Sequence, residues 1–173
     1  MTEITIRDYR PGDRDACLGI FDGNVPRFFV PAERAEFATF LDDLPGPYLV
    51  IEDARGRVIG CGGYALAPDR RSADICWDMI RPERLGTGLG RRLLEARLAR
   101  LRADPRVETV ALNTSQLTRG FYERFGFTTE RVVPDGYAPG LDRCDMRLDL
   151  RRARRRSGAA APGSAGPAPA DRG

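Results

Sequence analysis

The sequence contains no histidine, and this absence excludes several classes of active site. Nucleophilic sites of the Ser-His-Asp and Cys-His types are ruled out, as are metal centres that depend on histidine ligands. Lysine is missing as well, because all 28 basic residues are arginines. Any proton transfer in this protein must therefore use Asp, Glu, Tyr, Cys or water.

Cysteine is scarce, and long apolar runs are absent. The four cysteines, Cys17, Cys61, Cys76 and Cys144, lie far apart without the paired spacing of metal ligands. We therefore expect no metal and no disulfide framework, with these side chains buried as small hydrophobes. No stretch approaches the roughly 20 apolar residues of a membrane helix, and residues 1–8 lack the apolar core of a signal peptide. We expect a cytoplasmic protein with no membrane partner.

The composition predicts one folded domain followed by a tail. The chain has 173 residues, 42% of them hydrophobic, and residues 1–150 have the size of a typical domain. Residues 151–173 are rich in Arg, Ala, Gly and Pro and cannot bury enough apolar surface to fold, so we predict a disordered tail. The tail holds six arginines and one aspartate, a charge of +5, which leaves −2 for residues 1–150 out of the total of +3.

The arginine cluster of the tail raises the question of nucleic acid. We favour a solvated terminal extension over a contact with nucleic acid or acidic lipid, because a run of like charges usually faces solvent. Binding with a steep salt dependence that vanished on deletion of residues 151–173 would reverse this preference.

Hydrophobic periodicity predicts a mixed order of strands and helices with no internal repeat. The predicted strands are residues 4–9, 48–53, 58–66, 72–80, 109–112, 127–133 and 144–150. The predicted helices are residues 13–21, residues 31–41, a helix from residue 89 whose apolar face is Leu89, Leu93, Leu94, Leu98 and Leu101, and a short capped helix ending at Gly126. We predict the α/β class, with a mixed central β-sheet flanked by helices.

Alternating glycines mark the change from the strand 72–80 to the next helix. Gly86, Gly88 and Gly90 lack Cβ atoms, so their backbone N–H groups can approach an anion, and helix N-termini attract phosphates. The pattern predicts a diphosphate cradle. A dinucleotide fingerprint is excluded because Arg91 stands where its third glycine is required, and a Walker loop is excluded because it needs lysine. A plain glycine-rich helix start is the alternative.

A second segment, residues 113–127, follows a short apolar strand and places Tyr122 four residues before Gly126. The order of strand, glycine turn, helix, strand and short helix closing on Tyr-x-x-x-Gly-Phe resembles the GCN5-related N-acetyltransferases, the GNAT superfamily. The resemblance covers roughly residues 3–150 and implies a GNAT-like acyl-CoA transferase fold with acetyl-CoA as the cosubstrate. Without the glycine loop, Tyr122 would be interpreted as a half-buried aromatic residue of a helix.

The resemblance also implies the cofactor contacts. In that family the end of the strand pairs with the pantetheine arm, and the loop at the helix start binds the pyrophosphate. In this sequence those residues are Asp78, Met79, Ile80, Gly86, Thr87, Gly88, Leu89, Gly90 and Arg91. The usual Arg or Gln of the loop falls on Leu85, and the usual asparagine seven residues before the tyrosine is Ser115, which can still cap the helix and donate a hydrogen bond. The tyrosine beside the coenzyme sulfur, commonly assigned as the general acid, is Tyr122.

The acceptor of an acetyl group has to lose a proton. An alkylamine with a pKa near 10.4 lies about 4.6 kcal/mol from its neutral form at pH 7. Asp74 and Asp78 stand at even spacing on the predicted strand and hence on one face, where either carboxylate could serve as the base. Trp77 and Met79 would point to the opposite face. Alternatively, Asp74 is a solvated strand residue and Asp78 a fixed hydrogen-bond acceptor.

The thiolate of the cofactor has to leave. With a thiol pKa near 8.5 and a tyrosine pKa near 10, full protonation by Tyr122 is uphill by about 2 kcal/mol, although a hydrogen bond from its hydroxyl still helps. We therefore predict Tyr122, Asp78 and Asp74 as the catalytic residues.

Two connecting segments are predicted to bind the acceptor. Phe28 and Phe29 lie between the first two helices, and Asp135 and Tyr137 lie between the last two strands. Their aromatic rings and carboxylate would suit a cationic substrate with an apolar part. A plain turn explains the glycines and proline of residues 136–140 equally well.

These features predict an N-acetyltransferase that moves an acetyl group from acetyl-CoA to a primary amine by direct attack in a ternary complex. A catalytically silent acyl-CoA-binding sensor is the alternative, supported by the departures at Leu85 and Ser115 alone. The sequence leaves open the acceptor, the preferred acyl chain and whether the protein forms a homodimer.

Overall fold

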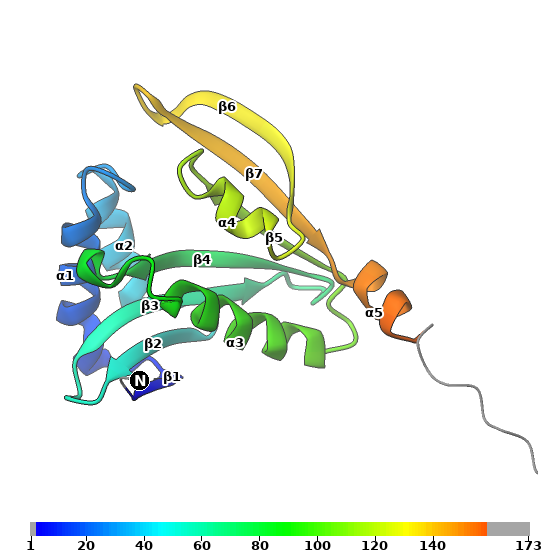
Figure 1. Ribbon diagram of the computed structural model, residues 1–173, viewed down its shortest axis with the longest axis horizontal. Coiled ribbons are helices and arrows are strands. Elements are labelled where there is room, and N and C mark those ends of the chain that lie inside the picture. The colour runs from blue at the N-terminus through cyan, green and yellow to red at the C-terminus, as the bar shows by residue number, and fades with distance from the viewer. Residues whose placement is uncertain (1–2, 159–173) are drawn as a thin grey trace, which may run out of the picture.

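The computed structural model describes residues 3–158 and arranges them around one seven-stranded sheet (Figure 1). The strands are β1 (Ile4–Asp8), β2 (Tyr48–Asp53), β3 (Val58–Leu66), β4 (Ser72–Ile80), β5 (Thr109–Thr114), β6 (Thr128–Ala138) and β7 (Leu141–Asp149). The α-helices are α1 (Arg14–Asn24), α2 (Glu33–Asp42), α3 (Leu89–Ala103), α4 (Arg119–Glu123) and α5 (Leu150–Gly158). The strand order is β1-β2-β3-β4-β5-β7-β6, with β4 and β5 parallel and the other neighbours antiparallel. The predicted fold class, a mixed sheet flanked by helices, is confirmed.

The first part of the sheet follows the predicted pattern, and the last part departs from it. The bounds of β2, β3 and β4 are those predicted. The helix predicted before Gly126 is shorter, because the carbonyl of Ser115 accepts from the amides of Thr118 and Arg119 and the segment turns before α4 begins. Strand β6 extends to Ala138, with breaks in its register against β7.

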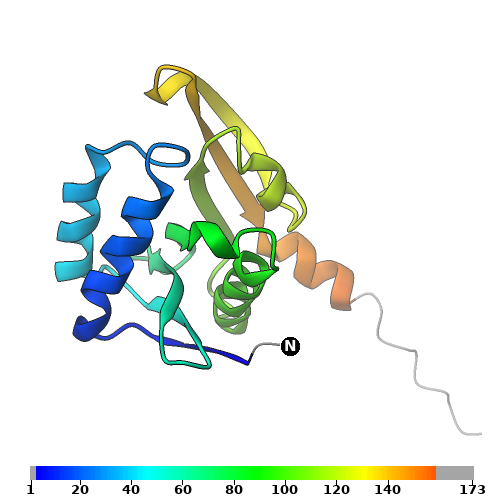
Figure 2. The same ribbon diagram turned by 60° about the vertical axis from the view of Figure 1, so that its left-hand side comes forward.

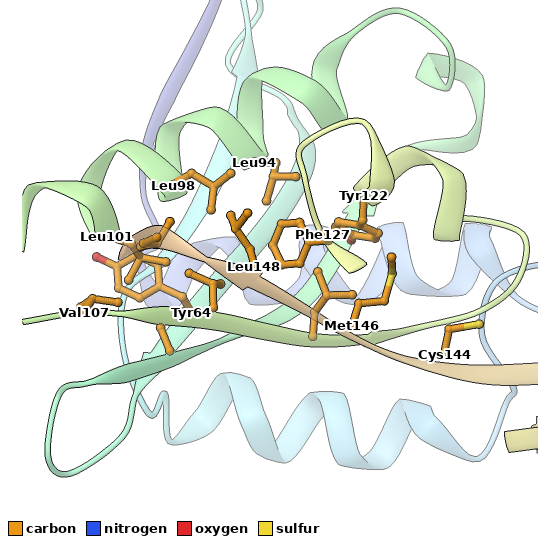
Figure 3. Packing of buried hydrophobic residues seen from close by; sticks show 14 residues of the cluster. Tyr64, Leu94, Leu98, Leu101, Val107, Tyr122, Phe127, Cys144, Met146 and Leu148 are labelled. Atoms are coloured by element: carbon orange, nitrogen blue, oxygen red, sulfur yellow. The ribbon is translucent and has the colours of Figure 1, made fainter. Parts of the chain in front are cut away.

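Helices cover both faces of the sheet (Figure 2). Helices α1 and α2 pack on one face, where Phe21 and Phe37 bury their rings completely. Helix α3 packs on the other face, with the predicted apolar stripe of Leu89, Leu93, Leu94, Leu98 and Leu101 buried as expected. Figure 3 shows Leu94, Leu98 and Leu101 against residues of β7 and the ring of Tyr122 from α4.

A β-bulge in β4 reverses the alternation of its side chains. Gly63 pairs with Cys76 and Cys61 with Met79, so Gly62 faces both Trp77 and Asp78, and Trp77 has a φ of 50°. The prediction that Asp74 and Asp78 share one face is therefore wrong. Ala73 and Ile75 on either side of Asp74 pack in the α3 cluster, which turns Asp74 to the other face, whereas Asp78 reaches the α3 face. Trp77 and Met79 point away from Asp78, as predicted, and in the cluster beneath α1 and α2 Met79 is buried and Trp77 partly buried.

Strands β4 and β5 pair over a short distance and then diverge. Their register joins Ser72–Asp74 to Thr109–Ala111, and none of the described residues beyond Asp74 continues the pairing. Figure 1 shows β7 and β6 rising away from β4 beyond this point. The sheet is thereby opened where Asp78 and the end of β4 lie.

The beginning of the predicted tail is helical. Helix α5 runs over Leu150–Gly158, although the composition of residues 151–173 predicts no folded structure. The carboxylate of Asp149 caps the helix by accepting from the amides of Arg151 and Arg152. The guanidinium of Arg154 donates to four backbone carbonyls in the last turn of α3 and just after it, those of Arg102, Asp104, Pro105 and Val107. The rest of the tail prediction concerns residues 159–173, which lie outside the described residues.

Two expectations about composition can be compared with the described part of the chain. Cys17, Cys61 and Cys144 are buried and free, as expected, whereas Cys76 is half-buried and also free. Over residues 3–158, no helix has the length and apolar character needed to cross a bilayer.

Candidate active site

A cleft of about 930 Å³ opens where β4 and β5 diverge. Its lining comes from the segment between α1 and α2, from β4, from the loop before α3, and from α3, β5, α4 and β6. We divide it into two arms. The glycine-loop arm comprises Arg84, Gly86, Gly88–Arg91, Phe121 and Arg124, and the acidic arm comprises Phe28, Phe29, Glu33, Asp74 and Tyr137.

The glycine-loop arm is built by the backbone at the start of α3. Gly86 and Gly88 have φ angles of 75° and 83°, in the left-handed region that other residues avoid, and an added Cβ at either would meet open space. Gly88 is the N-cap of α3 and makes no side-chain cap, and the first turn holds no acidic residue. The N-terminal amides and dipole of a 15-residue helix are thus open to an anion.

Three arginines line the glycine-loop arm, each from a different segment. Arg84 precedes the loop and lies 4.0 Å from the Asp53 carboxylate. Arg91 pairs with Glu95 at 2.8 Å, and Arg124 lies 6.0 Å from the centre of the Phe121 ring. This arm is therefore positive, which suits the phosphates of a nucleotide cofactor.

The predicted cofactor residues gather here, with one exception. Asp78, Met79, Ile80, Gly86, Gly88, Leu89, Gly90, Arg91 and Ser115 all line the cleft. Thr87 is not among the lining residues that the structure describes, and its hydroxyl donates to the carbonyl of Arg84 at 2.6 Å. Ser115 is buried and shapes the turn through its carbonyl. Leu85 is 40% exposed and lines the cleft without a polar side chain.

Three side chains converge at the centre of the cleft. The guanidinium of Arg97 donates to both carboxylate oxygens of Asp78, with Nη2 and Oδ2 2.8 Å apart. The hydroxyl of Tyr122 donates to the same Oδ2 at 3.0 Å. Burial and the negative charge of Asp78 raise the pKa of Tyr122 well above 10, so its hydroxyl is a proton-bearing donor at neutral pH. Sequence analysis placed Tyr122 and Asp78 at the site separately, and the structure joins them.

Sequence analysis missed Arg97. It stands within the apolar stripe of α3 and is fully buried, although arginine is almost never buried unless it is paired. A charged residue interrupting an apolar helical face was the available signal. Sequence analysis also missed Asn24, a buried side chain whose amide donates to the carbonyls of Ile20 and Ile80 and joins the end of α1 to the end of β4.

The acidic arm is lined by aromatic rings and carboxylates. Phe29 stacks on Trp77 with 5.9 Å between ring centres. The guanidinium carbon of Arg27 lies over the Phe28 ring, 4.9 Å from its centre. Asp74 is exposed at the end of the β4–β5 pairing. Both predicted phenylalanines and Asp74 thus line the cleft.

Glu33 and Tyr137 approach each other in the acidic arm from α2 and β6. Burial and the charge of Glu33 raise the pKa of Tyr137 to about 12. Burial also raises the pKa of Glu33, whose Oε2 accepts from the amide of Val30 at 2.8 Å. Tyr137 was predicted for this role and Glu33 was not, because the first turn of a helix favours glutamate for a purely local reason.

Asp135, also predicted to bind the acceptor, is not brought to the cleft. Its Oδ1 accepts from the amide of Gly140, and its own amide donates to Asp142 at 2.9 Å. It is not among the lining residues in the described part of the chain. These contacts agree with the alternative of a plain turn.

Comparison with known proteins identifies the family of this chain. The model of the acetyltransferase (GNAT) family matches residues 17–127, more than half of the chain. The chain belongs to the GNAT family. This makes it an acetyltransferase of a family that uses acetyl-CoA as cosubstrate. The matched range ends before β6, so Tyr137 lies outside it.

Solved structures share the fold of this GNAT chain along most of its length. A GNAT-family protein from Desulfovibrio desulfuricans is 25% identical with a TM-score of 0.72, over 86% of this chain and 99% of its own. The ribosomal-protein-S18-alanine N-acetyltransferase of Escherichia coli is 20% identical with a TM-score of 0.73, over 86% and 94%. Ard1 of Thermoplasma volcanium is 21% identical with a TM-score of 0.70, over 84% and 97%. A comparison with curated proteins gave no match.

Proposed function

We propose that this GNAT protein transfers an acetyl group from acetyl-CoA to a primary amine by direct attack while both are bound. The observation that carries the proposal is a continuous cleft in which a positive, glycine-built arm meets an acidic, aromatic arm at Asp78 and Tyr122. A cofactor with phosphates fits the first arm, and a cationic amine fits the second. The two reactants would meet between the diverging strands β4 and β5.

In the glycine-loop arm, the amides of Gly86–Arg91 would bind the diphosphate, with the arginines of the arm adding positive charge. Met79 and Ile80 lie at the end of β4 beside the loop and would bind the pantetheine arm through their backbone groups. Acetyl-CoA supplies an activated acetyl group as its thioester. The residues of this arm hold it and do no chemistry themselves.

In the acidic arm, Glu33 and Asp74 would attract the ammonium form of the acceptor, and Phe28 and Phe29 would contact its apolar part. Asp74 stands four residues before Asp78, about 13 Å away along an extended strand, and it lies on the opposite face. We therefore assign Asp74 to acceptor binding, and the proton of the amine leaves through water rather than directly to Asp74.

During transfer, the nitrogen–carbon bond forms as the carbon–sulfur bond breaks, and negative charge collects on sulfur. The single hydroxyl proton of Tyr122, which points to Asp78 in the structure, would turn to that sulfur and donate a hydrogen bond to it. Because its pKa is raised well above 10, complete proton transfer is harder than the roughly 2 kcal/mol expected for ordinary groups. Tyr122 thus stabilises the leaving thiolate as a hydrogen-bond donor.

The proposal is tested in two steps on the purified protein. The first step measures the thermal shift with acetyl-CoA, with ATP and NAD as anionic controls, because a ligand of the native state raises the apparent stability. The second step measures release of CoA with a panel of primary amines. Selective stabilisation followed by amine-dependent release is expected. Stabilisation with no release from any amine would favour the silent sensor, and the absence of any shift would overturn the cofactor assignment.

A further inference from the structure

Arg97, Asp78 and Tyr122 form a buried unit that joins three elements around the cleft. Arg97 comes from α3, Asp78 from the bulged part of β4 and Tyr122 from α4. Arg97 is 0% exposed, the side chain of Asp78 is 17% exposed and Tyr122 is 7% exposed. All three residues line the cleft, and of the three the Asp78 side chain is the most exposed.

The guanidinium of Arg97 is held on several sides. In addition to the two hydrogen bonds that the guanidinium donates to Asp78, its Nε donates to the carbonyl of Leu93 at 3.1 Å and its Nη1 to the carbonyl of Gly63 at 3.2 Å. Burial lowers the pKa of Arg97, but the charge and hydrogen bonds of Asp78 outweigh burial and raise it overall, so the side chain stays charged. Gly62 makes room for the pair, because a Cβ there would lie 2.7 Å from the Asp78 Oδ1.

A purely apolar contact would serve packing at this position at least as well. The other described members of the α3 stripe are leucines, and replacing a buried ion pair by apolar residues is often neutral or stabilising. Stability alone therefore gives no reason for a charge here. What the charge does provide is a fixed, doubly hydrogen-bonded carboxylate that accepts the Tyr122 hydroxyl.

We propose that Arg97 is a positioning residue for acetyl transfer, which holds the Asp78 carboxylate in place and through it the Tyr122 hydroxyl beside the reacting centre, where the hydroxyl turns its proton from Asp78 to the sulfur. The inference rests on the proposed function and deepens it. In this role Asp78 orients Tyr122 through the hydrogen bonds that it accepts from Arg97 and Tyr122, and the amine proton leaves through water.

The charge balance of the unit depends on Arg97. The other titratable groups that share an electrostatic interaction with Asp78 are the phenols of Tyr122 and Tyr48, on α4 and β2, and the thiol of Cys76 on β4. Burial, followed by the charges of Asp78 and Asp74, raises the pKa of Cys76 to about 11, and the pKa values of both phenols are raised as well. These three groups are neutral at pH 7, so removing Arg97 leaves Asp78 without a counter-charge from them.

The test is a double-mutant cycle between Arg97→Met and Tyr122→Phe, with kcat and both KM values measured for wild type, the two single variants and the pair. We expect Arg97→Met to lower kcat on the order of 30-fold with little change in the KM for acetyl-CoA. In the Tyr122→Phe background the same change should cost less than about 3-fold, because its effect passes through the hydroxyl. Equal costs in the two backgrounds would overturn the proposal.

Two further variants guard against a failure to fold. Arg97→Lys keeps the positive charge and loses the paired hydrogen bonds to Asp78. The fold-decrease in kcat that it causes should be smaller in the Tyr122→Phe background than in wild type. Asp78→Asn with Arg97 intact should retain more kcat than Tyr122→Phe, since an amide oxygen still accepts from the tyrosine, and a complete loss would restore Asp78 as the base. The wild-type rate tests the proposed function separately from these ratios.

Discussion

The two arms of the cleft are built by different means. The glycine-loop arm depends on backbone conformation, with Gly86 and Gly88 at φ angles of 75° and 83° before a long helix. The acidic arm depends on side chains from distant segments, with Glu33 of α2 near Tyr137 of β6. Backbone amides can bind any phosphate, whereas an amine is recognised by particular side chains that the fold brings together.

The family match covers most of both arms. It runs over residues 17–127, which include the whole glycine loop and Phe28, Phe29, Glu33 and Asp74 of the acidic arm, and it stops before Tyr137. We infer that the glycine-loop arm serves the cofactor of the family and that the acidic arm carries the acceptor preference of this protein. Substitutions in the two arms should therefore affect the two substrates separately.

The largest effect is expected where the arms meet. Tyr122→Phe should lower kcat roughly 100-fold, because it removes the donor to the leaving sulfur, with the KM for acetyl-CoA changed less than about 3-fold. Steady-state kinetics with both substrates varied will check this. Tyr64→Phe, at the far end of the same apolar cluster (Figure 3), is the matched control and should keep its rate. A loss of acetyl-CoA binding with normal turnover at saturation would contradict the role of Tyr122.

The next largest effect is expected from a substitution that disrupts the glycine-loop arm alone. Gly88→Val forces a β-branched residue into a left-handed conformation and should raise the Kd of acetyl-CoA about 30-fold. Binding by calorimetry will show the change, and the KM of the acceptor should move little. Gly19→Val, on the exposed side of α1 with no atom near its Cβ, is the control and should bind acetyl-CoA normally. Equal weakening by both substitutions would mean that the left-handed loop plays no special part.

A smaller effect is expected from a substitution that changes the acidic arm alone. Glu33→Gln should raise the acceptor KM about 10-fold without changing the Kd of acetyl-CoA. Burial raises the pKa of Glu33, so Glu33 takes up its proton at a higher pH than an ordinary glutamate. As the solution is acidified, the wild-type acceptor KM should therefore begin to rise at that higher pH. The Glu33→Gln variant should lack this pH dependence. The control is Glu36→Gln, an exposed change on the same helix.

The stability of Glu33→Gln gives a further check on the same residue. A carboxyl whose pKa is raised by folding destabilises the fold when it is ionised, so Glu33→Gln should unfold at the same temperature as wild type or at a higher one at pH 7. A clear fall in the melting temperature would indicate a structural residue and not a binding one.

The smallest effect concerns the support of the glycine-loop arm. Asp53 accepts from the amides of Arg55 and Arg57, and hydrogen bonds from Arg57 lower its pKa to about 2. Its stabilisation is present above the unfolded pKa near 3.8 and is lost as the pH falls through the folded value. Unfolding curves from pH 5 to 2 should therefore fall less steeply for Asp53→Asn than for wild type or for Asp43→Asn. Identical slopes would contradict the assignment.

The sequence predicts the glycine-loop arm well because its signals are local. Glycines between a strand and a helix indicate a loop whose backbone amides are accessible, and the leucine stripe of α3 indicates which face of the helix is buried. Tyr122 was identified through the resemblance to the GNAT superfamily, in which the spacing of four residues from Gly126 matches the family's tyrosine. Each of these signals lies within one short segment of the chain.

The sequence fails where one residue changes the geometry of others. The extra residue of the bulge at Trp77 moves Asp78 to the α3 face and leaves Asp74 on the opposite one, and regular alternation cannot foresee it. Arg97 could be understood only with its partner from another strand in view. Glu33 gains its meaning from Tyr137, about 100 residues later, and that is a contact of the fold.

The most direct test of the central claim is the initial-rate pattern with acetyl-CoA and an active amine varied together. If both arms are filled before transfer at Tyr122, double-reciprocal plots should intersect, and CoA and acetylated amine should form one for one. Parallel lines, or release of CoA that does not depend on the amine, would contradict transfer within a single two-armed cleft.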